Sequence, residues 1–341
     1  PVDDAGRPLR GGASRVIEGL VSVVIPVFNR ERMLLEAVAC VEAQTYGRVE
    51  LVLVDDGSTD GTGRLCDELA ARSPVKVRSL HQANAGPGAA REAGRKAARG
   101  EFLQYLDSDD LLYPEKLEKQ VAALRAAPDA GIAYCWTRLR RADGSVVEGP
   151  WKGSGQKRET MFPWFLTERW WDTPNPLYRR SVCDAAGPWL PLWQEEDWEY
   201  DCRIAAAGTK LVQVPEYLVE VREHAEGRLS GGDARDRRRL TARCEAHRRV
   251  YGHARDAGIG SESPFMQRYA RELFLLARQA GSAGLGAEAR EMFRLAREAS
   301  GPVRGRGADF RGYAAFAGVV GWEAAGRLAC LADRLRPEPA R

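Results

Sequence analysis

The sequence predicts an α/β protein with a mostly parallel sheet flanked by helices, followed by a C-terminal region built only of helices. Three observations lead to this prediction. Short apolar runs alternate with segments of helical periodicity through the first third of the chain, which is the pattern of βαβ units. The first of these runs is continuously apolar, as expected for a strand that is buried on both faces. Beyond residue 230 only helical periodicity remains.

Four strands are expected in the first part of the chain, each as a short and mostly apolar run. In chain order they cover residues 21–26, 49–54, 75–80 and 101–106. Residues 1–20 are rich in Gly, Asp and Arg without periodicity, so they are expected to form a flexible N-terminal lead-in.

Helices are expected between and after these strands, where apolar residues recur at helical spacing. In the first part of the chain they are residues 31–44, a helix from Asp60 to the Ser73-Pro74 stop, residues 88–98, and a helix that opens at Pro114. In the C-terminal region they are residues 235–251, 265–280, 287–299 and 313–335, which Gly clusters separate.

The composition excludes several other classes of protein. With 341 residues, 44% hydrophobic residues and a net charge of only +3, the chain does not have the composition of a disordered protein. No apolar run approaches the roughly 18 residues that span a bilayer. The N-terminal residues lack a secretory signal pattern, and the seven cysteines include no C-x-x-C pair. We therefore expect reduced thiols and a cytoplasmic protein.

The charge is distributed unevenly along the chain. Residues 222–341 contain 23 Arg and no Lys against 15 acidic residues, whereas the preceding part is net acidic. A change in the sign of the charge suggests that the role of the chain changes near residue 222.

Polar clusters follow the expected strands, and ligands of parallel sheets bind beyond the carboxyl ends of the strands. Asp107-x-Asp109 suits a hard divalent cation such as Mg²⁺ or Mn²⁺, although an acidic loop or a helix cap is the usual reading of an isolated pair. Asp56 belongs to a turn-like sequence, yet it is also placed to accept from a nucleobase N–H. Phe28 either stacks on that base or belongs to the core. Arg91 follows a Gly-Pro-Gly turn and could reach a phosphate.

Four motifs in this order resemble the family 2 glycosyltransferases of the GT-A fold, which are inverting enzymes that use nucleotide sugars. The motifs are VVIPVFN at residues 23–29, LVDDGSTD at 53–60, NAGPGAAR at 84–91 and YLDSDD at 105–110. The resemblance implies a GT-A domain over residues 21–230, with a nucleotide-sugar half at 21–113 and an acceptor half at 114–230, before the helical region at 231–341.

The resemblance also implies roles for individual residues. Asp109 is expected to bind the metal, and His224, in an Arg-x-His pattern with Ser230 six residues later, is expected to complete the metal or diphosphate site. The Arg91 contact is an inference from pattern alone. The residues expected at the nucleotide sugar are Pro26, Phe28, Asn29, Glu31, Asp56, Gly86, Arg91, Asp107 and Ser108.

A Glu-Glu-Asp sequence at residues 195–197 resembles the acceptor half of the same family. The resemblance implies that Asp197 is the general base on the acceptor hydroxyl, with Glu196 as the next candidate. A helix N-terminus that carries acids to suit its dipole is the alternative. Seven of the nine tryptophans lie between residues 151 and 198, and sugar rings pack on aromatic faces. Trp170, Trp171, Trp193 and Trp198, together with Trp164, are therefore acceptor candidates, although at least half are expected to be structural.

The Arg-rich region leaves two interpretations open. A helical bundle that packs on the catalytic domain is favoured, because the arginines are interleaved with acids such as Glu288, Glu291 and Glu298. The alternative is a peripheral contact with the inner face of a membrane near a lipid-linked acceptor. No nucleic-acid-binding motif accompanies the arginines.

The expected function is therefore metal-dependent transfer of a sugar, with inversion, as in polysaccharide biosynthesis. The resemblance favours a UDP-sugar as the donor and leaves a thymidine or guanosine nucleotide sugar as the alternative. The expected cofactor is Mn²⁺ or Mg²⁺. The acceptor is a glycan, a lipid-linked saccharide, a peptide or a small molecule. The alternatives are a non-catalytic nucleotide-sugar-binding scaffold and a nucleotidyltransferase.

Overall fold

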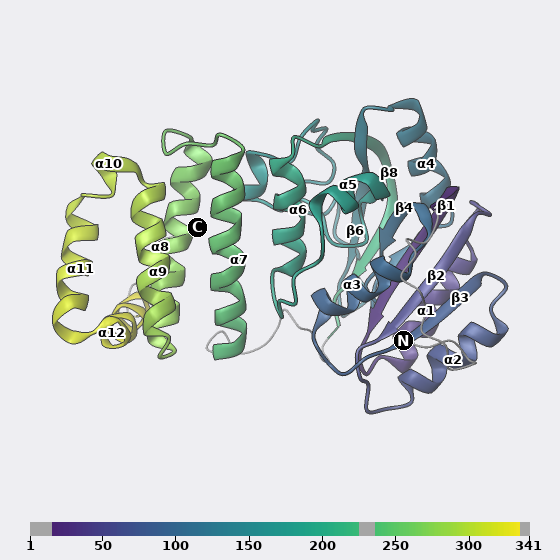
Figure 1. Ribbon diagram of the computed structural model, residues 1–341, viewed down its shortest axis with the longest axis horizontal. Coiled ribbons are helices and arrows are strands. Elements are labelled where there is room, and N and C mark those ends of the chain that lie inside the picture. Colours follow the sequence, from purple (N-terminus) through teal and green to yellow (C-terminus); the bar gives the residue numbers. More distant parts are fainter. Residues whose placement is uncertain (1–15, 225–235, 335–341) are drawn as a thin grey trace.

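The computed structural model describes residues 16–224 and 236–334 (Figure 1). Within this part of the chain one eight-stranded sheet has the order β3-β2-β1-β4-β7-β6-β8-β5. The strands are β1 (Ile17–Val27), β2 (Val49–Asp55), β3 (Lys76–His81), β4 (Gly100–Tyr105), β5 (Leu111–Leu112), β6 (Ala130–Arg140), β7 (Leu177–Arg179) and β8 (Lys210–Arg222).

The sheet is mixed, with its parallel part at the N-terminal side. Strand β1 pairs in parallel with β2 and β4, and β2 pairs in parallel with β3. The short strand β7 runs antiparallel to both β4 and β6 and so joins the two parts of the sheet. Strands β6 and β8 are parallel again, whereas β5 is antiparallel to β8. The prediction of a mostly parallel sheet flanked by helices is confirmed.

Helices cover both faces of this sheet. The described helices of this domain are α1 (Glu31–Glu42), α2 (Thr62–Arg72), α3 (Pro87–Ala97), α4 (Lys116–Ala126), a 3₁₀ turn (Trp164–Leu166), α5 (Arg180–Ala186) and α6 (Glu196–Ala206). Alternate residues of β1 enter two cores, because side chains of a strand point to opposite faces. Val23 and Ile25 pack with α1, α2 and α4, whereas Val24 packs in the core that α3, α5 and α6 share.

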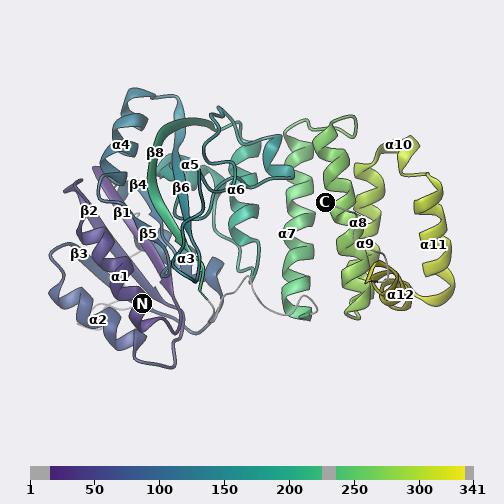
Figure 2. The same cartoon turned by 180° about the vertical axis from the view of Figure 1, so that it is seen from behind.

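The C-terminal helices continue the second of these cores. They are α7 (Arg237–Asp256), α8 (Pro264–Ser282), α9 (Gly286–Ala299), α10 (Gly301–Arg304), α11 (Ala308–Val320) and α12 (Trp322–Arg334). Helix α7 lies beside α6, and α8 to α12 follow it away from the sheet (Figures 1 and 2). Buried residues such as Leu240, Val250 and Tyr269 belong to the same cluster as Tyr200 and Ile204 of α6. The first helices of this region are therefore packed against the sheet domain by a continuous apolar core.

The structure corrects the sequence prediction at three elements. Strand β1 begins at Ile17, inside the expected lead-in. Helix α4 begins at Lys116 rather than at Pro114, whose carbonyl accepts from the backbone N–H of Thr45. The expected last helix is two helices, α11 and α12, because Gly321 between them has a φ of +86° that a right-handed helix cannot contain. The predicted boundary at residue 230 lies outside the described residues, as do most of residues 1–20.

None of the described helices combines the length and the apolar character that a membrane span requires.

Candidate active site

A cavity of about 630 Å³ opens at the carboxyl ends of the parallel strands. Residues that follow β1, β2 and β4 form one side of it, and the N-terminus of α6 with the segment before it forms the other. Of the predicted nucleotide-sugar residues, all but Glu31 line this cavity. The lining set is Pro26, Phe28, Asn29, Asp56, Gly86, Arg91, Asp107 and Ser108. Glu31 instead lies in the first turn of α1, with its carboxylate against Gly61.

The ring of Phe28 is 43% exposed, which is unusual for a phenylalanine at the end of a buried strand. It lies on the cavity wall and is therefore available for contact with a flat ligand. The next residue, Asn29, has a φ of +51° and joins β1 to the turn after β2. Its side-chain oxygen accepts from the backbone N–H of Thr59 at 2.8 Å, and its own N–H donates to Ser58. The first two strand ends are thus held together.

Asp56 holds the loop that precedes α3. Its carboxylate accepts from the backbone N–H groups of Ala85 and Gly86 at 2.9 and 2.8 Å, and from the side chain of Gln82. Gly86 has a φ of +91°, a conformation that residues with a Cβ rarely adopt. Asp56 therefore shapes the third strand end, whichever ligand group it also contacts.

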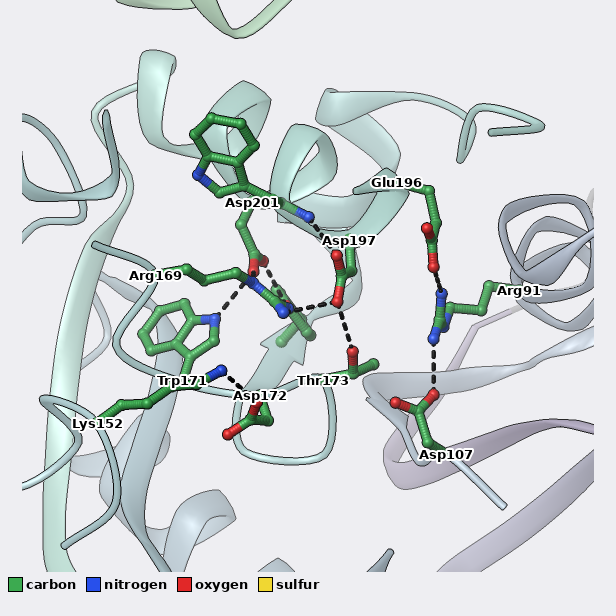
Figure 3. A network of polar contacts seen from close by, with 12 residues as sticks. Arg91, Asp107, Lys152, Arg169, Trp171, Asp172, Thr173, Glu196, Asp197 and Asp201 are labelled. Carbon is green, nitrogen blue, oxygen red and sulfur yellow. Dashed lines mark hydrogen bonds and ion pairs between the residues drawn. The ribbon is translucent and has the colours of Figure 1, made fainter. Parts of the chain in front are cut away.

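Arg91 is buried and joins the two sides of the cavity (Figure 3). It donates at 2.6 Å to both Asp107 and Glu196. Burial opposes its charge, but Asp107, Glu196 and Asp197 raise the pKa of Arg91 above its usual value. Both terminal nitrogens donate to these carboxylates, and the contact of Arg91 with a phosphate stays a prediction.

Asp109 and His224 come together from distant parts of the chain. The Nε2 atom of His224, just beyond the end of β8, lies 2.7 Å from a carboxylate oxygen of Asp109. No group of three His, Cys, Asp or Glu side chains placed for a metal is found among residues 16–224 and 236–334. Mg²⁺ and Mn²⁺ need no complete protein cage, since substrate phosphates and waters supply the remaining oxygens. The pair therefore fits a metal that is shared with a diphosphate.

The lining of the cavity is predominantly acidic. Acidic side chains outnumber guanidinium groups two to one in its lining, so a bound diphosphate would meet an excess of negative charge. The acidic residues are Asp56, Asp107, Asp109, Asp110, Asp172, Glu195, Glu196 and Asp197, and the arginines are Arg30, Arg91, Arg169 and Arg222.

Asp197 lies at the opposite side of the cavity from Phe28's strand, in the first turn of α6. One carboxylate oxygen accepts from Arg169 at 2.6 Å and from Thr173 at 3.0 Å, and the other accepts from the N–H of Trp198 (Figure 3). Burial would raise the pKa of Asp197, but Arg169 and Arg91 lower it to about 2. The side chain is therefore an anion with a fixed orientation.

The pKa of the neighbouring Glu196 is shifted in the opposite direction. Burial and the charge of Asp197 raise the pKa of Glu196 to about 7, even though Arg91 lowers it. Adjacent carboxylates with pKa values that differ this much can take different parts in one reaction.

The tryptophan predictions are corrected in part. Trp170 and Trp171 have no exposed surface, and they pack in the core against Phe165 and Tyr134. A saccharide cannot contact either ring without opening the core, so the prediction that they bind the acceptor is wrong. Their burial follows from the aromatic cluster, which the sequence pattern does not reveal.

The remaining indoles have different positions. Trp193 lines the cavity and stays an acceptor candidate. Trp198 donates to the carbonyl of Phe165 and packs on His247 and Tyr269 of the C-terminal helices, outside the cavity lining. Trp164 is 41% exposed but contacts Phe265 and Arg158 rather than the cavity.

Sequence reasoning missed the network behind Asp197. Arg169 donates to both Asp197 and Asp201, and Asp201 also accepts from the Trp171 indole and the Tyr178 hydroxyl (Figure 3). The same segment contributes Asp172, which forms an ion pair with Lys152. An arginine beside two tryptophans carries no motif, and only the folded chain places it against α6.

Comparisons with known proteins identify the family of the chain. Residues 22–185 match the family model described as Glycosyl transferase family 2. An uncharacterized glycosyltransferase of Nostoc sp. is 30% identical over 221 residues, which are 63% of this chain and 68% of the relative. The glycosyltransferase GlyG of Streptococcus pneumoniae is 42% identical over 100 residues, but these are only 29% of this chain and 33% of that protein.

Solved structures extend the likeness to the fold of most of the chain. TarS of S. aureus, residues 1–349, has a TM-score of 0.64 at 17% identity and covers 94% of this chain and 93% of its own. A mannosyltransferase from Pyrobaculum calidifontis, solved with GDP-Man and Mn²⁺, has a TM-score of 0.52 at 19% identity over 94% of this chain and 88% of its own. The strand-end motifs, the fold and these relatives lead to one conclusion: the chain belongs to glycosyltransferase family 2 and is a glycosyltransferase of the GT-A fold.

Proposed function

We propose that this enzyme transfers a sugar, with inversion, from a nucleoside diphosphate sugar to an acceptor hydroxyl, in a cavity that both substrates share. One observation carries the proposal. A single cavity has an exposed aromatic ring and strand-end carboxylates on one side, and an oriented carboxylate, Asp197, on the other. Displacement with inversion requires the base and the leaving diphosphate on opposite faces of the sugar.

The donor is proposed to lie along the strand ends. Phe28 would stack on the base, Asp56 and the backbone near Gly86 would border the nucleoside, and Asp107 would approach the ribose. TarS has been solved with UDP-GlcNAc, and the P. calidifontis mannosyltransferase with GDP-Man, so nucleotide sugars with either base fit this fold. We favour a UDP-sugar.

Asp109 and His224 would hold Mn²⁺ or Mg²⁺ at the diphosphate. The metal, when bound, supplies positive charge that stabilises the leaving diphosphate. The side chains of the protein orient the carboxylates of the site. Arg91 keeps Asp107 and Glu196 in place, and Arg169 with Thr173 aims the Asp197 carboxylate at the space where an acceptor hydroxyl would lose its proton.

The acceptor would enter beside Thr173, which donates to Asp197, and beside Asp172 and Trp193, which line the same cavity. A glycan, a lipid-linked saccharide, a peptide or a small molecule each offers the required hydroxyl. If the acceptor is a lipid-linked saccharide, the C-terminal region would make a peripheral contact with the membrane that holds it.

A thermal-shift panel tests the proposal directly. UDP, GDP and dTDP and their sugars are added to the full chain with Mn²⁺ or with a chelator. One base should raise the Tm in the presence of Mn²⁺, since saturating ligand at about 100 times its Kd stabilises by about 2.7 kcal/mol. A panel without any nucleotide-dependent shift would contradict the proposed donor site.

A further inference from the structure

Helix α7 of the C-terminal region reaches the wall of the catalytic cavity. It lies directly beside α6 in both views of the molecule (Figures 1 and 2). Two cavity-lining residues just before Glu196, namely Trp193 and Glu195, contact side chains of α7. The apolar core between the two regions does not require these polar contacts, so they call for a separate explanation.

Glu195 is held by two residues of α7. Its carboxylate accepts from the Nε atom of Arg243 at 2.8 Å and lies 3.2 Å from the Nε2 atom of His247. Burial would raise the pKa of Glu195, but His247 and Arg243 lower it. Tyr269 of α8 fixes His247 in turn, because the two rings stack at 5.5 Å and the Tyr269 hydroxyl donates to the His247 carbonyl.

The backbone conformation of Glu195 explains why contacts that fix its side chain matter. Glu195 is the N-cap of α6 and has a left-handed conformation, with φ at +60° and ψ at +19°. This conformation is uncommon for a residue with a long side chain. Its carbonyl accepts from the N–H of Glu199 and so begins the helix. The directions of Glu196 and Asp197, the next two residues, therefore depend on how Glu195 is held.

Trp193 is contacted from both parts of the molecule. The guanidinium of Arg238, at the start of α7, lies 3.5 Å from the centre of its ring. A Cβ on Gly86 would lie only 3.1 Å from the same ring, so the indole also packs closely on the loop that Asp56 holds. The segment from Trp193 to Glu195 thus spans from the donor loop to α7.

We propose that Arg243, His247 and Arg238 are positioning residues for glycosyl transfer, which act on the carboxylates of Glu196 and Asp197 by holding the segment 193–195. The C-terminal region is then part of the catalytic apparatus as well as a support for the fold. The inference rests on the proposed roles of Asp197 and Glu196.

Arg243→Gln tests the inference, and Arg249→Gln is the matched control. Both changes remove one arginine from α7, but Arg249 pairs with Glu245 of the same helix. We measure amide hydrogen exchange across residues 190–199 of the full chain, Tm and the affinity for UDP and GDP with Mn²⁺. Turnover is measured as the nucleoside diphosphate released when the sugar of UDP-N-acetylglucosamine or GDP-mannose is transferred to water.

Arg243→Gln should speed exchange in residues 190–199 by about tenfold, because local opening governs exchange. Turnover should fall by about 10- to 100-fold, since small misplacements of catalytic groups have effects of this size. Nucleoside diphosphate affinity should stay within about twofold. Arg243→Lys, which keeps the charge, should restore most of the turnover, and Glu195→Gln should reproduce the loss if Arg243→Gln fails to fold.

The outcomes separate this inference from the proposed function. Exchange and turnover in Arg243→Gln that match those of Arg249→Gln would overturn the inference. Faster exchange with unchanged turnover would overturn the inference as well. Catalysis by Glu196 and Asp197 would then not depend on how the segment 193–195 is held. If Asp197→Asn turns over at the wild-type rate, the proposed base is rejected, but the effect of Arg243→Gln on hydrogen exchange is unaffected.

Discussion

Arg91 donates to Glu196 across 2.6 Å and thereby links α3, in the first half of the domain, to α6, 105 residues later. Its second terminal nitrogen donates at the same distance to Asp107 at the end of β4. Both sides of the cavity are therefore tied to one buried cation. The guanidinium fork suits this task, because it can serve two carboxylates in fixed directions.

Replacing Arg91 should therefore destabilise the fold. Arg91→Met would leave the Asp107 and Glu196 carboxylates without their partner, and the loss of one member of a buried ion pair typically costs about 3–5 kcal/mol. Urea denaturation measures this loss, with Lys96→Met in the same helix as the control, since Lys96 is exposed and lies 3.5 Å from its partner Glu92. A loss of less than about 1 kcal/mol would mean that the bridge is not important for stability.

Nucleoside diphosphate binding should depend on Asp109 and on a divalent metal. Asp109→Asn keeps the size of the side chain but weakens it as a ligand of a hard cation, so affinity with Mn²⁺ should fall by about tenfold or more. Calorimetric titration with Mn²⁺ and then with excess chelator provides the comparison. Equal affinities in all conditions would remove the metal from the proposed mechanism.

Asp197→Asn should separate binding from chemistry. Nucleotide affinity should stay nearly unchanged, because Asp197 is proposed to act on the acceptor hydroxyl rather than on the donor, whereas turnover should fall by about two to four orders of magnitude. The amide keeps the contact with Thr173 but not the charge. Normal turnover in this variant would require another base, and Glu196→Gln would be examined next.

The pH profile distinguishes the two carboxylates. Asp197, with a pKa of about 2, stays ionised throughout the accessible range, whereas Glu196, with a pKa of about 7, takes up a proton as the pH falls. If Asp197 is the base, wild type and Glu196→Gln should have parallel profiles of kcat/KM from pH 5.5 to 8. A tenfold loss per pH unit below 7 that is present only in wild type would assign the base to Glu196.

The C-terminal region should not bind anionic vesicles strongly. Helices α7 to α9 bury their apolar faces in the core shared with α6, and Arg294 pairs with Glu291 on its own helix. Cosedimentation with anionic and neutral vesicles at low and high salt measures the contact. Strong binding to anionic vesicles alone, weakened by salt, would favour the membrane interpretation, because exposed charges are screened.

Sequence alone determined the fold class, the chemistry of the strand ends and most of the cavity. The apolar strands and the motifs around Phe28, Asp56 and Asp109 are local patterns, and parallel strands bring their carboxyl ends to one edge of the sheet. His224 and Asp109, which the family pattern links, lie side by side in the structure, and their role at a metal stays a prediction. Periodicity also predicts the long helices of the C-terminal region, but neither the short helix α10 nor the break at Gly321.

Only the tertiary structure decided which side chains act together across long separations. Trp171 and Trp193 look equivalent in the sequence, yet one is enclosed in the core and the other lines the cavity. The partners of Asp197 and Glu195, namely Arg169 and Arg243, belong to no motif. Burial and pairing depend on neighbours from other segments, so local patterns cannot encode them. For the same reason the carboxylates of Glu196 and Asp197, adjacent in the chain, acquire pKa values of about 7 and about 2.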